Sequence, residues 1–218
     1  MSIAILNQAL NFPDPRHANA KGLVAIGGDL SVERLLLAYR NGIFPWTVSP
    51  ISWWSPDPRA ILELDKLHIG ESLRKVLRKE MFQVTVDTAF NQVIQNCAAR
   101  APGRDDTWIT EEFIEAYTRL HKGGHAHSVE CWQNGELAGG IYGVAVGGLF
   151  AGESMFHRAD NASKIALWRL VEQLKQSGFA LFDIQMVTEA TKPFGAREIS
   201  RAEYLQRLAL AVKQQCTF

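Results

Sequence analysis

Residues 125–156 constrain the fold more than any other segment, because their hydrophobic pattern has a period of two. Three stretches in this region, 125–133, 136–146 and 149–156, have the length and composition of strands. The turns between them are Asn134-Gly135 and Gly147-Gly148. Asn-Gly is a strong hairpin signal because both central residues of that turn adopt positive φ. The segment therefore predicts a meander of three antiparallel strands.

A helix and another strand follow the meander. Residues 162–177 carry apolar side chains at helical spacing, and 179–186 have the pattern of a strand. A last helix is predicted over 201–214. Three strands, a helix and then another strand indicate a mixed sheet rather than a doubly wound one. We therefore expect an α+β protein whose larger part has the element order of the N-acetyltransferase-like (GNAT-like) fold.

The first 62 residues differ in amino-acid composition from the rest. They hold six of the eight prolines and three of the six tryptophans. One clear helix is predicted there, about 32–41, with Ser31 as its N-cap and Gly42 just after its end. A segment with one helix cannot form a large core alone. We therefore expect a small N-terminal domain, residues 1–62, packed on a GNAT-like domain, residues 63–218.

Charge and cysteine content exclude several classes of protein. Lys plus Arg and Asp plus Glu are both 23, so a chain-wide basic character is excluded, although a local basic face can still bind nucleic acid. The three cysteines form no CxxC pair, which argues against a disulfide framework or a zinc ribbon. Residues 1–10 lack the pattern of a signal peptide, and no apolar run approaches the roughly 18 residues of a membrane helix. We expect a cytoplasmic protein, a monomer, with no membrane segment and no metal.

The strand 180–186 carries two polar residues, Asp183 and Gln185, which the period of two places on one face. Polar groups in an apolar strand are costly if they are buried without partners. Asp183 can accept a hydrogen bond from the Gln185 side-chain nitrogen, which leaves the Gln185 carbonyl facing an outside donor such as an attacking amine. The alternative is an edge strand with one solvated face.

An acidic residue in a strand and a basic helix can each be interpreted as a binding site or as ordinary solvated surface. Glu153 lies in a strand among aromatic and sulfur side chains, where it could bind a cation or belong to a solvated face. The predicted helix 71–80 carries four basic residues on one side: Arg74, Lys75, Arg78 and Lys79. Such a face suits phosphate backbones, but it is also typical of an ordinary solvated surface.

Several longer runs resemble one family, the leucyl/phenylalanyl-tRNA–protein transferases. The runs are residues 22–30 (GLVAIGGDL), 42–46 (GIFPW), 53–59 (WWSPDPR), 107–110 (TWIT), 126–130 (AHSVE), 152–156 (GESMF) and 161–164 (NASK). They occur in the family's order, and the resemblance extends from about residue 12 to residue 208.

The resemblance implies an activity. The family transfers Leu, Phe or Met from aminoacyl-tRNA to proteins that begin with Arg or Lys, which marks them for N-end rule degradation. It uses no metal or soluble cofactor and forms no acyl-enzyme. The fold implied is a small N-terminal domain on an N-acetyltransferase-like domain.

The resemblance also implies roles for individual residues. Asp183 and Gln185 match a catalytic pair, and Glu153 matches a residue near the basic side chain of the acceptor. The basic helix corresponds to the tRNA-binding surface. The aminoacyl pocket would be formed by Trp108, Ile141, Phe150, Gly152, Met155, Leu170, Leu174 and Ile184, with Trp46 near the 3′-terminal adenosine.

Two other functions remain open at this point. An acetyl-CoA-dependent N-acetyltransferase would share the fold, but the usual Gly-rich pyrophosphate loop is missing. A tRNA-binding protein without activity would have no use for Asp183, Gln185 and Glu153. The sequence does not identify the preferred donor or the physiological acceptors.

Overall fold

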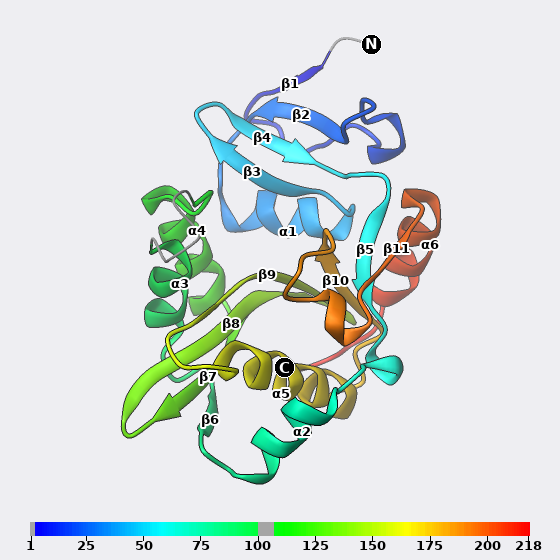
Figure 1. Ribbon diagram of the computed structural model, residues 1–218. Helices are drawn as coiled ribbons and strands as arrows, with labels where there is room; N and C mark the ends of the chain where they lie inside the picture. Colours follow the sequence, from blue (N-terminus) through cyan, green and yellow to red (C-terminus); the bar gives the residue numbers. More distant parts are fainter. Residues whose placement is uncertain (1–2, 100–106) are drawn as a thin grey trace.

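The computed structural model describes residues 3–99 and 107–218 (Figure 1). The N-terminal part forms a four-stranded sheet of order β1-β2-β4-β3. Its strands are β1 (Ala4–Leu6), β2 (Leu23–Gly27), β3 (Phe44–Val48) and β4 (Ile51–Trp54). The helix α1 (Val32–Arg40) connects β2 to β3, and the Ser31 hydroxyl accepts the Arg34 backbone N–H at its start. The predicted helix is confirmed, but the sheet around it was not predicted.

The larger part contains a seven-stranded sheet of order β11-β5-β10-β9-β8-β7-β6. The predicted meander is confirmed as β7 (Ala126–Gln133), β8 (Glu136–Val146) and β9 (Leu149–His157). The strand β10 (Leu181–Gln185) pairs parallel with β9, which makes the sheet mixed. The remaining strands are β5 (Arg59–Leu62), β6 (Gln83–Val86) and β11 (Arg197–Ile199), all paired antiparallel. The α+β class is therefore confirmed.

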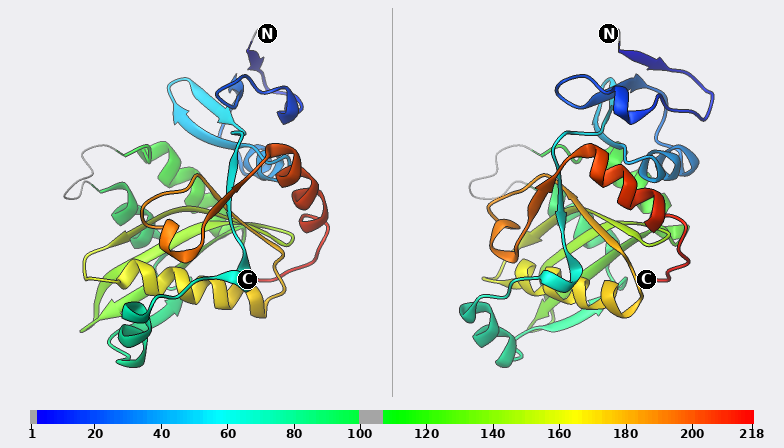
Figure 2. Two further views of the ribbon diagram at one scale, coloured as in Figure 1. Left: turned by 45° about the vertical axis from the view of Figure 1, so that its right-hand side comes forward. Right: turned by 90° about the vertical axis from the view of Figure 1, so that its right-hand side faces the viewer.

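Helices cover both faces of the larger sheet (Figures 1 and 2). On one face lies α5 (Ala162–Gln176), with α2 (Glu71–Arg78) packed against it. On the other face lie α3 (Phe90–Ala98), α4 (Glu111–Lys122) and α1. The last helix, α6 (Arg201–Ala211), contacts β10. Short 3₁₀ turns occur at Pro15–His17, Leu64–Lys66 and Lys192–Phe194.

The small sheet and the larger domain share one hydrophobic core. The cluster that contains Val24, Tyr39 and Trp53 also contains Phe113 and Tyr142 of the larger domain. A second cluster lies under α5 on the opposite face. The strand β5 (Arg59–Leu62) belongs to the larger sheet, although the predicted boundary counts these residues with the N-terminal part. The division into two domains stays a prediction.

Within the described ranges, no helix is long and apolar enough to cross a membrane.

Candidate functional site

A β-bulge at the end of β10 shapes the site. Asp183 lies opposite Ile61 of β5, but Gln185 lies opposite Ala60, so Ile184 is an extra residue in β10. Gln185 has a φ of 62°. This left-handed conformation costs a non-glycine residue roughly 1 kcal/mol, and such outliers cluster at functional sites. The bulge separates the directions of the two polar side chains, which a regular strand would keep parallel.

Asp183 is fully buried and accepts four hydrogen bonds. Arg59 donates twice, from Nε to Oδ1 at 2.9 Å and from Nη2 to Oδ2 at 2.6 Å. The Tyr204 hydroxyl donates to Oδ2 at 2.8 Å, and the backbone N–H of Gln185 donates to Oδ1 at 2.8 Å. The solvated-face interpretation of this strand is therefore wrong for Asp183.

Arg59 connects β10 to the N-terminal part of the chain. Its guanidinium lies between the rings of Phe44 and Tyr204, 4.7 and 4.5 Å from their centroids. It also donates to the Gly42 carbonyl at 3.1 Å. Burial opposes the charged form of Arg59, but the Asp183 carboxylate outweighs this effect and raises the Arg59 pKa. A Cβ at Gly42, whose φ is 73°, would lie 2.8 Å from the Tyr204 ring, so this close approach requires glycine.

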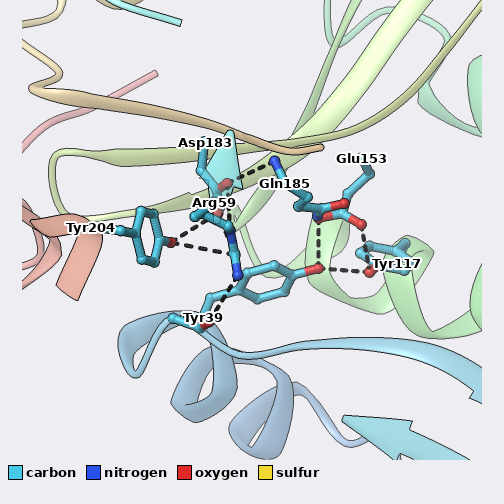
Figure 3. Close-up of polar contacts among 8 residues, drawn as sticks. Tyr39, Arg59, Tyr117, Glu153, Asp183, Gln185 and Tyr204 are labelled. Atoms are coloured by element: carbon cyan, nitrogen blue, oxygen red, sulfur yellow. Dashed lines mark hydrogen bonds and ion pairs between the residues drawn. The ribbon is translucent and has the colours of Figure 1, made fainter. Parts of the chain in front are cut away.

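The Gln185 side chain turns away from Asp183 and toward Glu153 (Figure 3). Its Nε2 donates to Glu153 Oε1 at 2.9 Å. The predicted side-chain bond between Gln185 and Asp183 is therefore wrong, because Asp183 is occupied by Arg59, Tyr204 and the Gln185 main chain. The Gln185 carbonyl oxygen forms no hydrogen bond with any residue that the structure describes. This oxygen is therefore available to an outside donor, and its role in holding an attacking amine stays a prediction.

Glu153 is only 9% exposed, so a solvated position is wrong for this residue as well. It is also not unpartnered, because the Tyr39 hydroxyl donates to Oε1 at 2.8 Å and the Tyr117 hydroxyl to Oε2 at 3.1 Å. The two hydroxyls lie 2.6 Å apart. Burial raises the pKa of Glu153 to about 7, although the hydrogen bonds from the two tyrosines act in the opposite direction.

Gln185 and Glu153 line a cavity of about 430 Å³ between β3, β9, β10 and α5. This volume lies in the range of small-molecule binding sites. Its walls are mostly apolar. The lining residues that carry aromatic, aliphatic or thioether side chains are Phe44, Trp46, Trp108, Ile141, Met155, Leu167, Phe182, Ile184 and Met186. Glu153 is the only charged residue among the described residues that line the cavity.

The structure brings most of the predicted pocket together. Trp46, Trp108, Ile141, Gly152, Met155 and Ile184 all line the cavity. Three predicted residues do not: Phe150, Leu170 and Leu174 are buried in the cluster under α5. Phe150 lies behind the cavity, with its ring 5.8 Å from that of Phe182. Asp183 also lies outside the lining and reaches the cavity only through Gln185.

The basic helix is α2. Arg74, Lys75, Arg78 and Lys79 are all exposed, and within the described part of the chain no carboxylate pairs with them. The helix packs on α5, whose Leu167 lines the cavity (Figure 1). Among the described residues, these four cations therefore lie without a carboxylate partner on α2 and at its C-terminal end, on a helix that packs against α5. Whether they bind nucleic acid stays a prediction.

Sequence reasoning missed four residues of the polar network: Tyr39, Arg59, Tyr117 and Tyr204. Three are tyrosines on the apolar faces of helices, where a buried hydroxyl needs a partner. Arg59 ends the run 53–59 but was not assigned a role. In residues 3–99 and 107–218, no three His, Cys, Asp or Glu side chains gather in a way that could hold a metal.

Family models match most of the chain. The model of the "Leucyl/phenylalanyl-tRNA protein transferase" family matches residues 61–209, and the model of its N-terminal domain matches residues 28–57. Curated proteins called leucyl/phenylalanyl-tRNA–protein transferase are similar over nearly the whole length. One from Anaeromyxobacter sp. (strain Fw109-5) is 53% identical over 215 residues, covering 97% of this chain and 92% of that protein. One from Syntrophobacter fumaroxidans is 54% identical over 212 residues, covering 96% and 91%.

Solved structures are much more distant. A GCN5-related N-acetyltransferase from Kribbella flavida has a TM-score of 0.41 and 10% identity, covering 75% of this chain and 59% of that one. The structure of L-PGS from Bacillus licheniformis has a TM-score of 0.41 and 15% identity, covering 72% and 51%. These scores are too low to carry a functional argument.

Proposed function

The chain belongs to the leucyl/phenylalanyl-tRNA–protein transferase family, and on that premise we propose that it transfers Leu, Phe or Met from aminoacyl-tRNA to proteins that begin with Arg or Lys. The new peptide bond forms at the α-amino group of the acceptor. The product carries a new N-terminal residue that marks it for N-end rule degradation.

The observation that carries this proposal is that Gln185, whose side-chain carbonyl has no partner among the described residues, lines an apolar cavity. The cavity offers Ile141, Met155, Leu167 and Phe182 to an apolar side chain. Gln185 lines the same cavity, and its carbonyl oxygen has no hydrogen-bond partner among the residues that the structure describes. A donor side chain and an attacking amine can therefore meet in one place.

The chemistry requires chiefly positioning. An aminoacyl ester is already activated, so an amine held against its carbonyl carbon can displace the 3′-terminal ribose oxygen. Gln185 accepts a hydrogen bond from the amine and orients its lone pair. Asp183 is a positioning residue, because it holds the Gln185 main chain and does not line the cavity.

The aminoacyl side chain binds to the apolar walls. A pocket of this kind separates similar apolar side chains by only about 1–3 kcal/mol. Several donors are therefore accepted, whereas a charged donor is rejected because its charge would be buried without a partner. Trp46, at the edge contributed by β3, can stack on the 3′-terminal adenine, since bases stack well on aromatic rings.

The tRNA body binds to the basic face of α2, the helix that carries Arg74, Lys75, Arg78 and Lys79. Contacts to phosphates give affinity without reading the sequence, which suits an enzyme that accepts several tRNAs. Glu153 faces the acceptor terminus, where its negative charge favours the cationic α-ammonium group.

The test compares donors. Purified tRNAs charged with labelled Leu, Phe, Met or Asp are incubated with a peptide that begins with Arg. We expect label on the peptide from the first three donors and none from Asp-tRNA. Equal transfer from Asp-tRNA would contradict the apolar cavity as the donor site.

A further inference from the structure

The number of protons in the Glu153 cluster does not match the number of its hydrogen bonds. The cluster comprises Glu153 and the hydroxyls of Tyr39 and Tyr117, which form a triangle of three close contacts, at 2.6, 2.8 and 3.1 Å. Each hydrogen bond needs one proton. Burial, together with the neighbouring Glu153, raises the pKa of both tyrosines well above 10, so each keeps its own proton.

Two hydroxyl protons cannot satisfy three contacts. When Glu153 is ionised, one side of the triangle has two oxygens in contact without a proton between them. When Glu153 is protonated, the three protons fill the three contacts in a ring. The triangle therefore accommodates one additional proton without moving any heavy atom.

The same cluster lies beside the group that holds the attacking amine. Glu153 Oε1 is 2.9 Å from Gln185 Nε2, and both residues line the cavity. An acceptor terminus is an ammonium group near neutral pH and must lose a proton before it can attack. The Gln185 carbonyl accepts hydrogen bonds but does not take up a proton under these conditions. Asp183 is separated from the cavity and already accepts four donors.

We propose that Glu153 is a further catalytic residue, which takes up the proton that the acceptor α-ammonium releases, with Tyr39 and Tyr117 as its positioning residues. The proposal rests on the proposed function, because it concerns the acceptor of that reaction. The contact is with the α-ammonium group common to all acceptors, rather than with the basic side chain that the resemblance implied.

The protons balance over the reaction. The α-ammonium transfers one proton to the Glu153 carboxylate and becomes a neutral amine. The amine attacks the ester carbonyl carbon, the C–N bond forms, and the C–O bond to the ribose breaks. The second amine proton passes to the departing ribose oxygen, and Glu153 returns its proton to solvent.

The surroundings of Glu153 define the pH range. The titratable and charged groups that face it are Tyr39 of α1, Arg59 of β5, Tyr117 of α4, Tyr142 of β8 and Asp183 of β10. Burial dominates and raises the pKa of Glu153 to about 7. The carboxylate is the active form, so the rate falls as the pH drops below this value.

The experiment measures kcat/KM between about pH 5.5 and pH 8, with Leu-tRNA and peptides that begin with Arg or Ala. The pH profile of the wild type should have a limb near pH 7 with both peptides: kcat/KM should fall below this pH, by roughly tenfold one pH unit lower. Glu153→Gln should lose this limb, and its rate should follow the amine of the peptide, which ionises at about 7.7–8.0. Near neutral pH, the kcat/KM of this variant should be at least about tenfold lower than that of the wild type.

A matched pair of tyrosine variants provides a second, independent measurement. Tyr117→Phe removes a donor that stabilises the carboxylate, so the limb should move to higher pH. Tyr142 packs against Tyr117, but its buried hydroxyl has no hydrogen-bond partner in the described part of the chain. Tyr142→Phe should therefore leave the limb where it is.

The outcomes separate this proposal from the proposed function. A wild type that transfers Leu but has no limb near pH 7 overturns the role of Glu153. So does a Glu153→Gln variant that keeps the wild-type limb, or a Tyr142→Phe variant that shifts it as far as Tyr117→Phe does. A wild type that transfers nothing to any peptide overturns the proposed function itself.

Discussion

Asp183 and Gln185 are joined through the main chain, since Asp183 Oδ1 accepts the Gln185 backbone N–H at 2.8 Å. The Gln185 side chain is held separately, by Glu153 at 2.9 Å. Asp183 therefore stabilises the bulge at the end of β10, and Glu153 sets the orientation of the Gln185 side-chain amide. A carboxylate only accepts hydrogen bonds, so the amide nitrogen faces Glu153, and the amide oxygen has no partner among the described residues.

This relationship predicts non-additive losses of activity. Gln185→Ala should lower single-turnover transfer roughly 10- to 100-fold, with little change in tRNA affinity, because it removes the group that orients the amine. Asp183→Ala should act through the same residue. The double variant should therefore lose little more than the worse single variant. Losses that multiply in full would show that the two residues act independently.

The buried ion pair predicts a pattern of stabilities. Asp183→Leu or Arg59→Leu leaves a buried charge without its partner, which typically costs about 3–5 kcal/mol. The double variant removes both charges and should be destabilised by clearly less than the sum. Urea unfolding measures all three. Tyr204→Phe serves as a milder comparison: it removes the hydroxyl that donates to Asp183 and accepts from Arg59, and it should cost about 1.5–3 kcal/mol. Additive losses in the double variant would argue against a tightly coupled pair.

Glu153 predicts a pH dependence of stability that needs no substrate. Its pKa in the folded protein is about 7, above the ordinary value of 4.5. Between these values the folded state holds a proton that the unfolded state has released, so the free energy of unfolding falls as the pH rises. The change is about 3 kcal/mol over this range. Glu153→Gln cannot titrate, so the free energy of unfolding of this variant, relative to that of the wild type, should increase by about this amount as the pH rises. A difference between the two proteins that stays constant with pH would contradict the raised pKa of Glu153.

The basic helix predicts a salt dependence of tRNA binding. Changing Arg74, Lys75, Arg78 and Lys79 together to Ala should weaken the binding of charged tRNA and reduce the slope of log K against log salt. Each lost phosphate contact should account for about 0.7–0.9 of that slope. Lys21 and Lys213 are exposed on other parts of the chain, so their Ala variants serve as controls. An unchanged slope in the helix variant would show that this face is merely solvated.

Two neighbouring phenylalanines separate the lining of the cavity from the core behind it. Phe182 lines the cavity, whereas Phe150 packs behind it. Phe182→Ala should enlarge the site and raise the preference for Phe over Leu as the donor side chain. Phe150→Ala should cost about 3–5 kcal/mol of stability but leave that preference close to the wild-type value. Competition between Phe-tRNA and Leu-tRNA measures the preference, and equal shifts in both variants would contradict the assignment.

The fold could be predicted where one local signal decides the structure. Asn134-Gly135 predicted the β7–β8 hairpin, and both residues have positive φ. The N-terminal sheet was missed because its strands are short and contain proline and tryptophan, so they show no period of two. Gln185 was predicted to share a face with Asp183, and the bulge at Ile184 could not be read from the alternation. The network of Tyr39, Arg59, Tyr117 and Tyr204 joins residues far apart in the chain, and no local pattern reports such contacts.

The most direct test of the account is transfer from labelled Leu-tRNA to three peptides that differ only in a first residue of Arg, Lys or Ala, followed by sequencing of the products by mass spectrometry. The account predicts that Arg and Lys peptides gain a single Leu on the α-amino group far faster than the Ala peptide does. It also predicts that Gln185→Ala slows this reaction. Leu found on a lysine side chain, equal rates for all three peptides, or no transfer by the wild type would contradict it.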